Sequence, residues 1–254
     1  MAEKLKNDKV KANKNNLPDE RSLWGRFLSS SAMFLMRFFT QINYVNSENI
    51  PNDLPYVIAP NHQTYIDGLM VAKGLPKDHF KKFSALIGAD LKTDHGIIGK
   101  MILPVARGIE VERYGNPVRG LVMACRAAKA GNIILVHPEG TRTHDGLVAP
   151  LQSGAAYIAM KSDIPLIPVY IEGGFEVFSR YDKIPKRKNT FTKKKNVINI
   201  IYGKAMLPQD YKDADEFTKA IENWLKAREA EYLEKNVGKL RPRPNIDQTK
   251  EPKE

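Results

Sequence analysis

The stretch NPVRGLVMACRAAKAGNIILV, from Asn116 to Val136, decides the fold class. Its first part predicts a helix that ends at Gly131, a residue type that commonly terminates helices. The run NIILV that follows is short, apolar and rich in β-branched residues, which is typical of a buried strand. A helix leading directly into such a strand is the repeating unit of α/β proteins.

The same alternation continues on both sides of this stretch. Further strands are predicted from the runs YVIA, GIEVE, IPLIPVYI and NVINIIYG. A second helix is predicted from LQSGAAYIAMKSD, and a closing amphipathic helix from ADEFTKAIENWLKAREAEYLEKN. Continuously apolar strands favour a largely parallel sheet covered on both faces. We therefore predict one α/β domain over residues 46–238, with a mixed, largely parallel sheet covered by helices.

Composition narrows the class of partner. The 254 residues carry a formal net charge of +11, which implies attraction to nucleic acid, a phospholipid surface or a phosphorylated substrate. The single Cys125 excludes an intramolecular disulfide and a cysteine-based zinc cluster. Residues 1–22 are rich in Lys and Asn with no secretory signal, and they predict a disordered basic arm. Residues 239–254 are rich in Pro and charge and predict a disordered tail.

Residues 23–45 predict an amphipathic helix. One apolar stripe follows helical spacing, while Arg26 and Arg37 interrupt any apolar run long enough to cross a bilayer. Such a helix either packs on the domain or lies in the lipid headgroup layer. The adjacent basic arm favours the second interpretation, an interfacial helix on a membrane.

Polar residues collect where the predicted strands end. YVIAP runs into His62, GIEVE into Arg113, and NIILVHP into Glu139–Arg142. In open α/β sheets, ligands bind at the carboxyl ends of the strands. Histidine is the usual general base at neutral pH, and Asp67 would orient it if the chain turns irregularly between the two. The arginines would clamp an anionic group. This set predicts deprotonation of a hydroxyl on a phosphorylated acceptor.

Four blocks in this order resemble the glycerolipid acyltransferase family. They are NHQTYID with the pattern H-x4-D, GIEVER, HPEGTR with the pattern E-G-T-R, and the proline-containing strand IPLIPVYI. The likeness covers roughly residues 55–173. An H-x4-D pattern alone is unspecific, but it is specific when P-E-G-T-R follows at this distance.

The resemblance implies a fold like that of glycerol-3-phosphate acyltransferase and a role for each block. His62 would deprotonate the acceptor hydroxyl with support from Asp67. Arg113 would contact the acceptor phosphate, and the E-G-T-R block would shape that subsite through Glu139, Gly140, Thr141 and Arg142. Pro168 would border the acyl pocket. The family needs no cofactor, takes acyl-CoA or acyl carrier protein as the acyl donor, and typically lies on the membrane through an N-terminal helical element.

Three residues depart from the family pattern, at His137, Glu110 and Glu112, and they affect the choice of acceptor rather than the reaction class. A metal site that includes His62 and His137 lacks any known ligand spacing, so no metal is predicted. The basic segment Pro185–Lys195 is either a solvated loop or a contact for anionic lipid or an acidic carrier protein. Nucleic acid is not an expected partner, because no binding module is recognisable.

We predict a peripheral membrane enzyme on the cytoplasmic face that acylates 1-acylglycerol-3-phosphate, which is lysophosphatidic acid, to give phosphatidic acid in phospholipid synthesis. The alternative is another lysolipid acceptor, such as lysophosphatidylethanolamine or an amino-acid lysolipid. Less favoured alternatives are a non-enzymatic membrane-surface protein and a nucleic-acid-binding protein. Replacement of His62 separates these classes, because only an enzyme would lose turnover.

Overall fold

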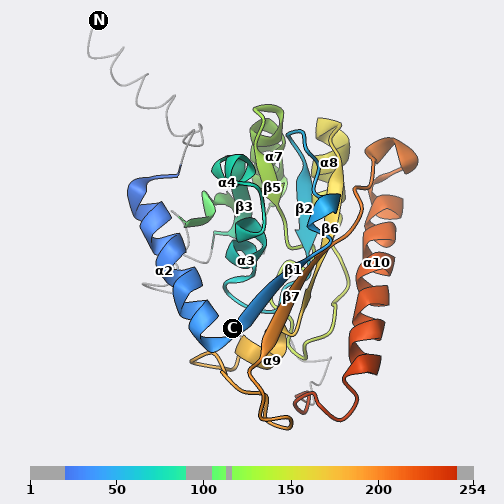
Figure 1. The fold of residues 1–254 in the computed structure, drawn as a ribbon. Coiled ribbons are helices and arrows are strands. Elements are labelled where there is room, and N and C mark those ends of the chain that lie inside the picture. Colours follow the sequence, from blue (N-terminus) through green and yellow to red (C-terminus); the bar gives the residue numbers. More distant parts are fainter. Residues whose placement is uncertain (1–20, 90–104, 113–115, 245–254) are drawn as a thin grey trace, which may run out of the picture.

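A computed structural model of the chain describes residues 21–89, 105–112 and 116–244. Within these residues, seven strands form one sheet in the order β1-β7-β6-β2-β5-β3-β4 (Figure 1). The strands are β1 Gln41–Val45, β2 Val57–Pro60, β3 Phe83–Gly88, β4 Ile109–Val111, β5 Ile133–Leu135, β6 Leu166–Glu172 and β7 Val197–Tyr202.

The sheet is mixed but largely parallel, as predicted. Neighbouring strands run parallel except β6 and β7, where Val169 pairs with Tyr202 in an antiparallel register. The carboxyl ends of β2, β3, β4 and β5 therefore meet at one edge of the sheet. The loops that follow β2 and β5 contain the H-x4-D and E-G-T-R blocks, so this topology brings the two blocks together.

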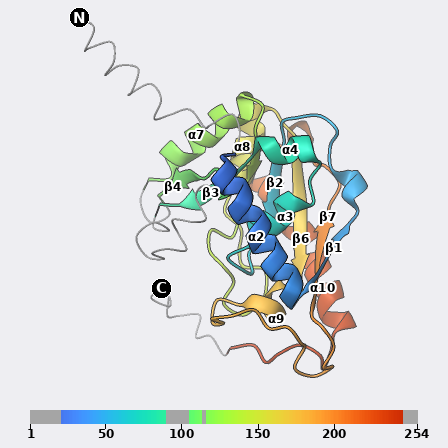
Figure 2. The ribbon, with the colours of Figure 1, turned by 60° about the vertical axis from the view of Figure 1, so that its left-hand side comes forward.

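Helices cover both faces of the sheet (Figures 1 and 2). One face carries α2 Leu23–Phe39, α3 Asp67–Lys73, α4 Lys77–Lys82 and α9 Gly174–Phe178. The other face carries α7 Val118–Lys129, α8 Gly154–Ser162 and α10 Ala214–Lys235. Two short 3-10 helices, Ser47–Asn49 and Pro208–Asp210, lie in connections.

Successive side chains of β6 pack into the apolar clusters on opposite faces of the sheet. Ile167 and Val169 belong to the apolar cluster under α2 and α3, whereas Leu166 and Tyr170 belong to the cluster under α8 and α10. Successive side chains of a strand point to opposite faces. Both faces of the sheet are buried, so the continuous apolar runs of the sequence are explained.

The predicted helix over residues 23–45 is wrong at its carboxyl end. Helix α2 ends at Phe39, Thr40 is extended, and Gln41–Val45 forms β1, which pairs with β7. Ile42 fits the helical spacing of the stripe before it, but it also fits an alternating strand, and the pairing with β7 decides between them. The domain therefore includes β1 and begins before the predicted residue 46.

Both predicted tails are shorter than expected. Arg21 is buried and donates hydrogen bonds to three main-chain carbonyl oxygens, those of Phe80, Phe83 and Val105. At the other end, Arg241 pairs with Asp182 at 2.8 Å and Arg243 pairs with Glu176 at 3.0 Å. Arg21 and Arg243 are therefore part of the folded domain rather than of the predicted disordered segments. The rest of both predicted segments, residues 1–20 and 245–254, lies outside the described residues.

Candidate active site

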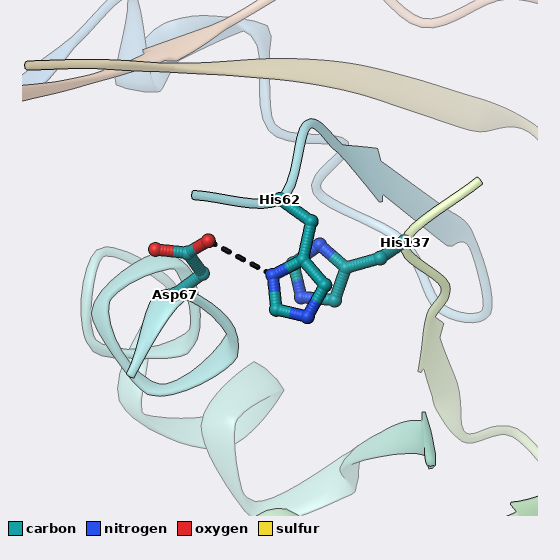
Figure 3. A group of neighbouring side chains, drawn as sticks. All are labelled: His62, Asp67 and His137. Carbon is teal, nitrogen blue, oxygen red and sulfur yellow. Dashed lines mark hydrogen bonds and ion pairs between the residues drawn. The ribbon is translucent and has the colours of Figure 1, made fainter. Parts of the chain in front are cut away.

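His62 and Asp67 lie in contact at the carboxyl end of β2. The chain leaves β2 at Pro60 and turns irregularly before α3 begins at Asp67. This turn brings Nδ1 of the His62 ring within 3.0 Å of Oδ2 of Asp67 (Figure 3). Because the partner is a carboxylate, Nδ1 donates the hydrogen bond, and Nε2 is therefore the ring nitrogen that carries the lone pair.

The carboxylate of Asp67 is completely buried and held by its own loop. It accepts hydrogen bonds from the main-chain N–H of Gln63 at 2.6 Å and Thr64 at 2.8 Å, and from the Thr64 hydroxyl at 2.7 Å. Burial raises the pKa of Asp67 above its ordinary value, while these hydrogen bonds act in the opposite direction. The donors fix the carboxylate, so Asp67 can hold the His62 ring in a single orientation.

The E-G-T-R loop holds the main chain of His62 from both sides. The His62 N–H donates to Oε1 of Glu139 at 2.7 Å, and the Thr143 N–H donates to the His62 carbonyl oxygen at 2.8 Å. The side chain of Asn61 makes two further hydrogen bonds to the main chain of Ile171 in β6. The loop that carries His62 is therefore fixed by hydrogen bonds to two neighbouring segments.

Glu139 has a different position from the one that the resemblance implied. Its second oxygen, Oε2, accepts from the Ala149 N–H at 3.0 Å, so both carboxylate oxygens bind main-chain donors of the protein. The side chain is buried, and burial raises the pKa of Glu139 to about 8. Because it does not line the cavity beside His62, the predicted substrate contact is replaced by a structural one, in which Glu139 joins the two motif loops.

The other members of the E-G-T-R block open onto a cavity of about 550 Å³ that also contains His62. Gly140, Thr141 and Arg142 all line it. Gly140 has a φ of +76°, and a Cβ there would lie 2.7 Å from the amide nitrogen of Gln152. The turn therefore requires glycine for both its backbone conformation and its space.

Arg142 lies in this cavity with its guanidinium carbon 3.4 Å from the centroid of the Tyr65 ring. The side chain is 8% exposed. Arg180 donates to the Arg142 carbonyl oxygen at 2.9 Å, which fixes the loop from outside. A cation stacked on an aromatic ring in the same cavity as His62 suits an anionic group on a molecule whose hydroxyl reaches the imidazole.

The remainder of the cavity is mainly apolar. Helix α2 contributes Leu28 and Ala32, and α3 contributes Leu69. Other apolar walls come from the strands and loops at the same edge of the sheet, namely Phe83, Ala85, Leu86, Ile87, Val105, Ala106, Val111, Leu121, Leu135, Val136 and Phe178. A cavity with a polar end and a long apolar wall matches an amphipathic substrate.

Of the two other residues predicted for the site, one cannot be placed and the other lies away from the cavity. Arg113 lies outside the described residues. Pro168 lies in β6 opposite Ala59 of β2, on the face covered by α8 and α10. Its ring packs beside Gly203, which the Trp224 side chain also approaches. Pro168 does not line the cavity.

Sequence reasoning missed how His137 is placed. Its ring stacks on that of His62, with centroids 3.7 Å apart and planes 11° apart (Figure 3). Its Nδ1 lies 3.1 Å from the carbonyl oxygen of Asn61 and 3.3 Å from that of Pro60, so Nδ1 is the protonated nitrogen. Burial, together with the neighbouring His62, lowers the pKa of His137 to about 3, so the ring is neutral at physiological pH.

The signal for His137 in the sequence was its position before the P-E-G-T-R run. Tyr65 and Gln152, which contact the E-G-T-R loop, gave no such signal.

The geometry does not favour a metal ion at this position. Ligand atoms of His62, Asp67 and His137 lie within 4.8 Å of one another. However, both oxygens of Asp67 already accept hydrogen bonds, and the two rings are parallel, so their lone pairs do not converge on one point. Proton transfer by His62 is the chemistry that these contacts support.

Comparison with known proteins finds a matching family and named relatives. Residues 41–172 match the model of the Acyltransferase family. A 1-acyl-sn-glycerol-3-phosphate acyltransferase of Bacillus subtilis is 27% identical over 165 residues, which are 61% of this chain and 76% of that protein. The alpha form from Ovis aries is 24% identical over 159 residues and is matched over only 51% of its length.

A solved structure shares the fold. The crystal structure of PlsC from Thermotoga maritima, described as a 1-acyl-sn-glycerophosphate acyltransferase, has a TM-score of 0.63 and 23% sequence identity. The match covers 83% of this chain and 78% of that one. Since the family match spans just over half of the chain and includes both loops that meet at His62, the chain belongs to the glycerolipid acyltransferase family.

Proposed function

We propose that this protein transfers a fatty acyl chain from a thioester to the free hydroxyl of lysophosphatidic acid and so forms phosphatidic acid. The observation that carries the proposal is that His62 and Arg142 line one cavity whose other walls are mainly apolar. The names of the related proteins from Bacillus subtilis and Ovis aries support this choice of acceptor.

The reaction needs a base and an anion site, and no acyl-enzyme intermediate. His62 Nε2 takes the proton of the acceptor hydroxyl while that oxygen attacks the thioester carbonyl carbon. Asp67 stabilises the imidazolium that forms, through the hydrogen bond at Nδ1. The carbon–sulfur bond then breaks, and the departing thiolate takes the proton from His62. The base is thereby restored, and an ester and a free thiol are the products.

Arg142 binds the acceptor phosphate in this proposal, together with main-chain groups of Gly140 and Thr141. The amino end of α8 opens onto the same cavity through Ser153 and Gly154, and free main-chain N–H groups at a helix start attract anions. The apolar wall holds the acyl chain. Acyl-CoA or acyl carrier protein serves as co-substrate, and no cofactor takes part.

The proposal includes a position on the cytoplasmic face of a membrane, held by α2. This helix packs on the domain through small residues and methionines, and it turns a broad apolar face toward solvent. The exposed residues are Leu23, Trp24, Phe27, Phe34, Leu35 and Phe38, each more than half exposed. Within the described part of the chain, no helix is both long and apolar enough to span a bilayer. An interfacial position suits an exposed aromatic face of this kind.

The basic segment Pro185–Lys195 lies at the carboxyl end of the same helix. The guanidinium of Arg187 lies 4.9 Å from the centroid of the Phe38 ring, and Lys195 donates to the carbonyl oxygen of Arg37. Cations therefore border the exposed aromatic face, which is the arrangement expected for an anionic lipid surface.

Turnover of a panel of acceptors tests the proposal. Purified protein is given lysophosphatidic acid, lysophosphatidylethanolamine or an amino-acid lysolipid, with acyl-CoA or acyl carrier protein as donor, and products are measured by mass spectrometry. We expect phosphatidic acid to be the main product, and His62→Ala to lower kcat by about 10²- to 10⁴-fold. Product only from acceptors without a phosphomonoester would overturn the role of Arg142 and support the alternative lysolipids.

A further inference from the structure

A second, smaller cavity of about 270 Å³ is lined by residues of α2, α3 and α4 and of the segments beside them. Figure 2 shows α3 and α4 beside the amino-terminal half of α2. We call it the basic pocket, because five of its eight lining residues are cationic and none is acidic. The lining residues are Arg21, Arg26, Ala72, Lys73, Leu75, Lys77, Phe80 and Lys81.

Two of the cations are held close together around one ring. The guanidinium carbon of Arg21 lies 4.3 Å from the centroid of Phe80, and Nζ of Lys73 lies 4.4 Å from the same centroid. Arg21 cannot move away, because three carbonyl oxygens hold it. Burial lowers the pKa of Lys73, and the charges of Arg21 and Arg37 lower it further. The positive charges of Arg21 and Lys73 are therefore held close together although they repel each other.

The acidic side chain of α4 does not neutralise this charge. In the described structure, that residue is Asp78, which is 87% exposed and pairs with Lys81 at 3.1 Å. The pair accounts for one of the five cations. The lining of the pocket keeps an excess of positive charge, which a bound phosphate would offset.

The basic pocket lies beside the exposed aromatic face of α2. Residues of an α-helix are about 100° apart around its axis, so Arg26 and Arg37 share one flank of α2. Leu28 and Ala32 lie on the opposite flank, where they line the active-site cavity. Trp24 and Phe27 point outward between the two flanks. A lipid leaflet covering the aromatic face would thus place both flanks, and with them the basic pocket and the active-site cavity, at the level of the headgroups.

We infer that the basic pocket binds the phosphate of an anionic phospholipid headgroup in the membrane surface, at a site separate from the acceptor subsite at Arg142. The inference rests on the membrane position proposed above for α2. Such binding would orient the protein on the membrane. A headgroup held on one flank of α2 would keep the opposite flank, and the mouth of the active-site cavity, at the lipid surface.

Vesicle binding tests the inference without needing turnover. The double variant Lys73→Gln/Lys77→Gln removes two charges from the pocket and keeps the buried Arg21. The matched control, Lys193→Gln/Lys194→Gln, removes two charges from the basic segment. Each protein is co-sedimented with vesicles of phosphatidylcholine alone and of phosphatidylcholine with phosphatidylglycerol, and its fold is checked by circular dichroism.

We expect the pocket variant to lose about 10- to 30-fold in affinity for the anionic vesicles. The control should lose clearly less, and binding to neutral vesicles should be unchanged in both. Equal losses in both variants would indicate a diffuse basic surface and would overturn the pocket.

Soluble ligands separate the sources of phosphate. We expect short-chain phosphatidylglycerol, below its micelle concentration, to bind to the wild type more tightly than inorganic phosphate, and to bind weakly to the pocket variant. Equal binding of inorganic phosphate would overturn the lipid assignment. Wild type that binds neither type of vesicle would refute the proposed membrane position itself, whereas equal binding to both types would refute only the basic pocket.

Discussion

The ring of His137 lies flat against the ring of His62, with the two centroids 3.7 Å apart. His137 is anchored through Nδ1 to the main chain just before His62, so it supports one face of the His62 ring. Asp67 fixes the same ring at its edge through Nδ1. One contact lies on the face of the His62 ring and the other at its edge, and together they fix the orientation of the ring.

His137→Phe should keep most of the activity, because it replaces one flat ring by another and His137 carries no proton in the proposed reaction. We expect kcat within a few-fold of the wild type and a loss of about 1–3 kcal/mol in stability, since two carbonyl oxygens lose a donor. His137→Ala, the comparison variant, should lower kcat by about 10-fold or more, because His62 loses its support. Steady-state kinetics and urea unfolding measure both. A Phe variant as inactive as His62→Ala would mean that His137 itself transfers a proton.

The placement of the site followed from the sequence because parallel strands end at one edge of a sheet. Runs that end in His62 and in the E-G-T-R block could therefore be assigned to one cleft by sequence pattern alone. The direction of each side chain could not be assigned. Glu139 and Arg142 are three residues apart in one loop, yet one binds the main chain beneath the site and the other lines the cavity.

The fold was predictable where helices and strands alternate with clear boundaries. The prediction failed at β1 and β3, which carry weak local signals. Gln41–Val45 follows α2 with one residue between them, and Phe83–Gly88 follows α4 directly. The first run is a strand because β7 pairs with it, and the second is a strand because β4 and β5 pair with it. Such pairing is a tertiary effect that a local pattern does not contain.

Glu139→Gln tests the structural role of the buried carboxyl. The folded state raises the pKa of Glu139 to about 8, above the ordinary value of 4.5. Because the unfolded chain releases this proton at lower pH, Glu139 makes the free energy of unfolding fall as pH rises from about 4.5 to about 8. The variant lacks this titration. We expect the wild type to exceed the variant in stability most at pH 5 and least at pH 9, as measured by urea unfolding. A difference that grows with pH would contradict the assignment.

The same variant separates positioning from substrate binding. Glu139→Gln can accept only one of the two main-chain hydrogen bonds, so His62 should move slightly from its place. We expect kcat to fall with little change in the KM for the acceptor. Arg142→Lys should instead raise that KM, because lysine lacks the planar pair of donors that arginine offers to a phosphate. A Glu139 variant that changed only KM would restore the predicted substrate contact.

Asp67→Asn should cost both activity and stability. Asparagine has no negative charge to stabilise a protonated His62, and its amide nitrogen cannot accept the hydrogen bonds at one of the two oxygen positions that Asp67 fills. We expect kcat to fall by about 10²-fold or more, because the His62 tautomer is no longer fixed, and the free energy of unfolding to fall by about 1–3 kcal/mol. Turnover and urea unfolding are measured on the same preparation. Retained activity would exclude a role for Asp67 in orienting His62.

Leu69→Phe should shorten the acyl chain that the enzyme prefers. Leu69 projects from α3 into the apolar wall of the 550 Å³ cavity, and a larger ring there occupies space that the chain would fill. Val122→Phe is the matched control, because it adds a ring on α7 at a residue that does not line the cavity. Competition between saturated acyl donors of different length, scored by product mass, gives the preference of each variant. We expect the preferred acyl chain to become shorter by about two carbons or more in Leu69→Phe and to stay unchanged in Val122→Phe. An unchanged profile, with the fold intact, would place the acyl chain outside this cavity.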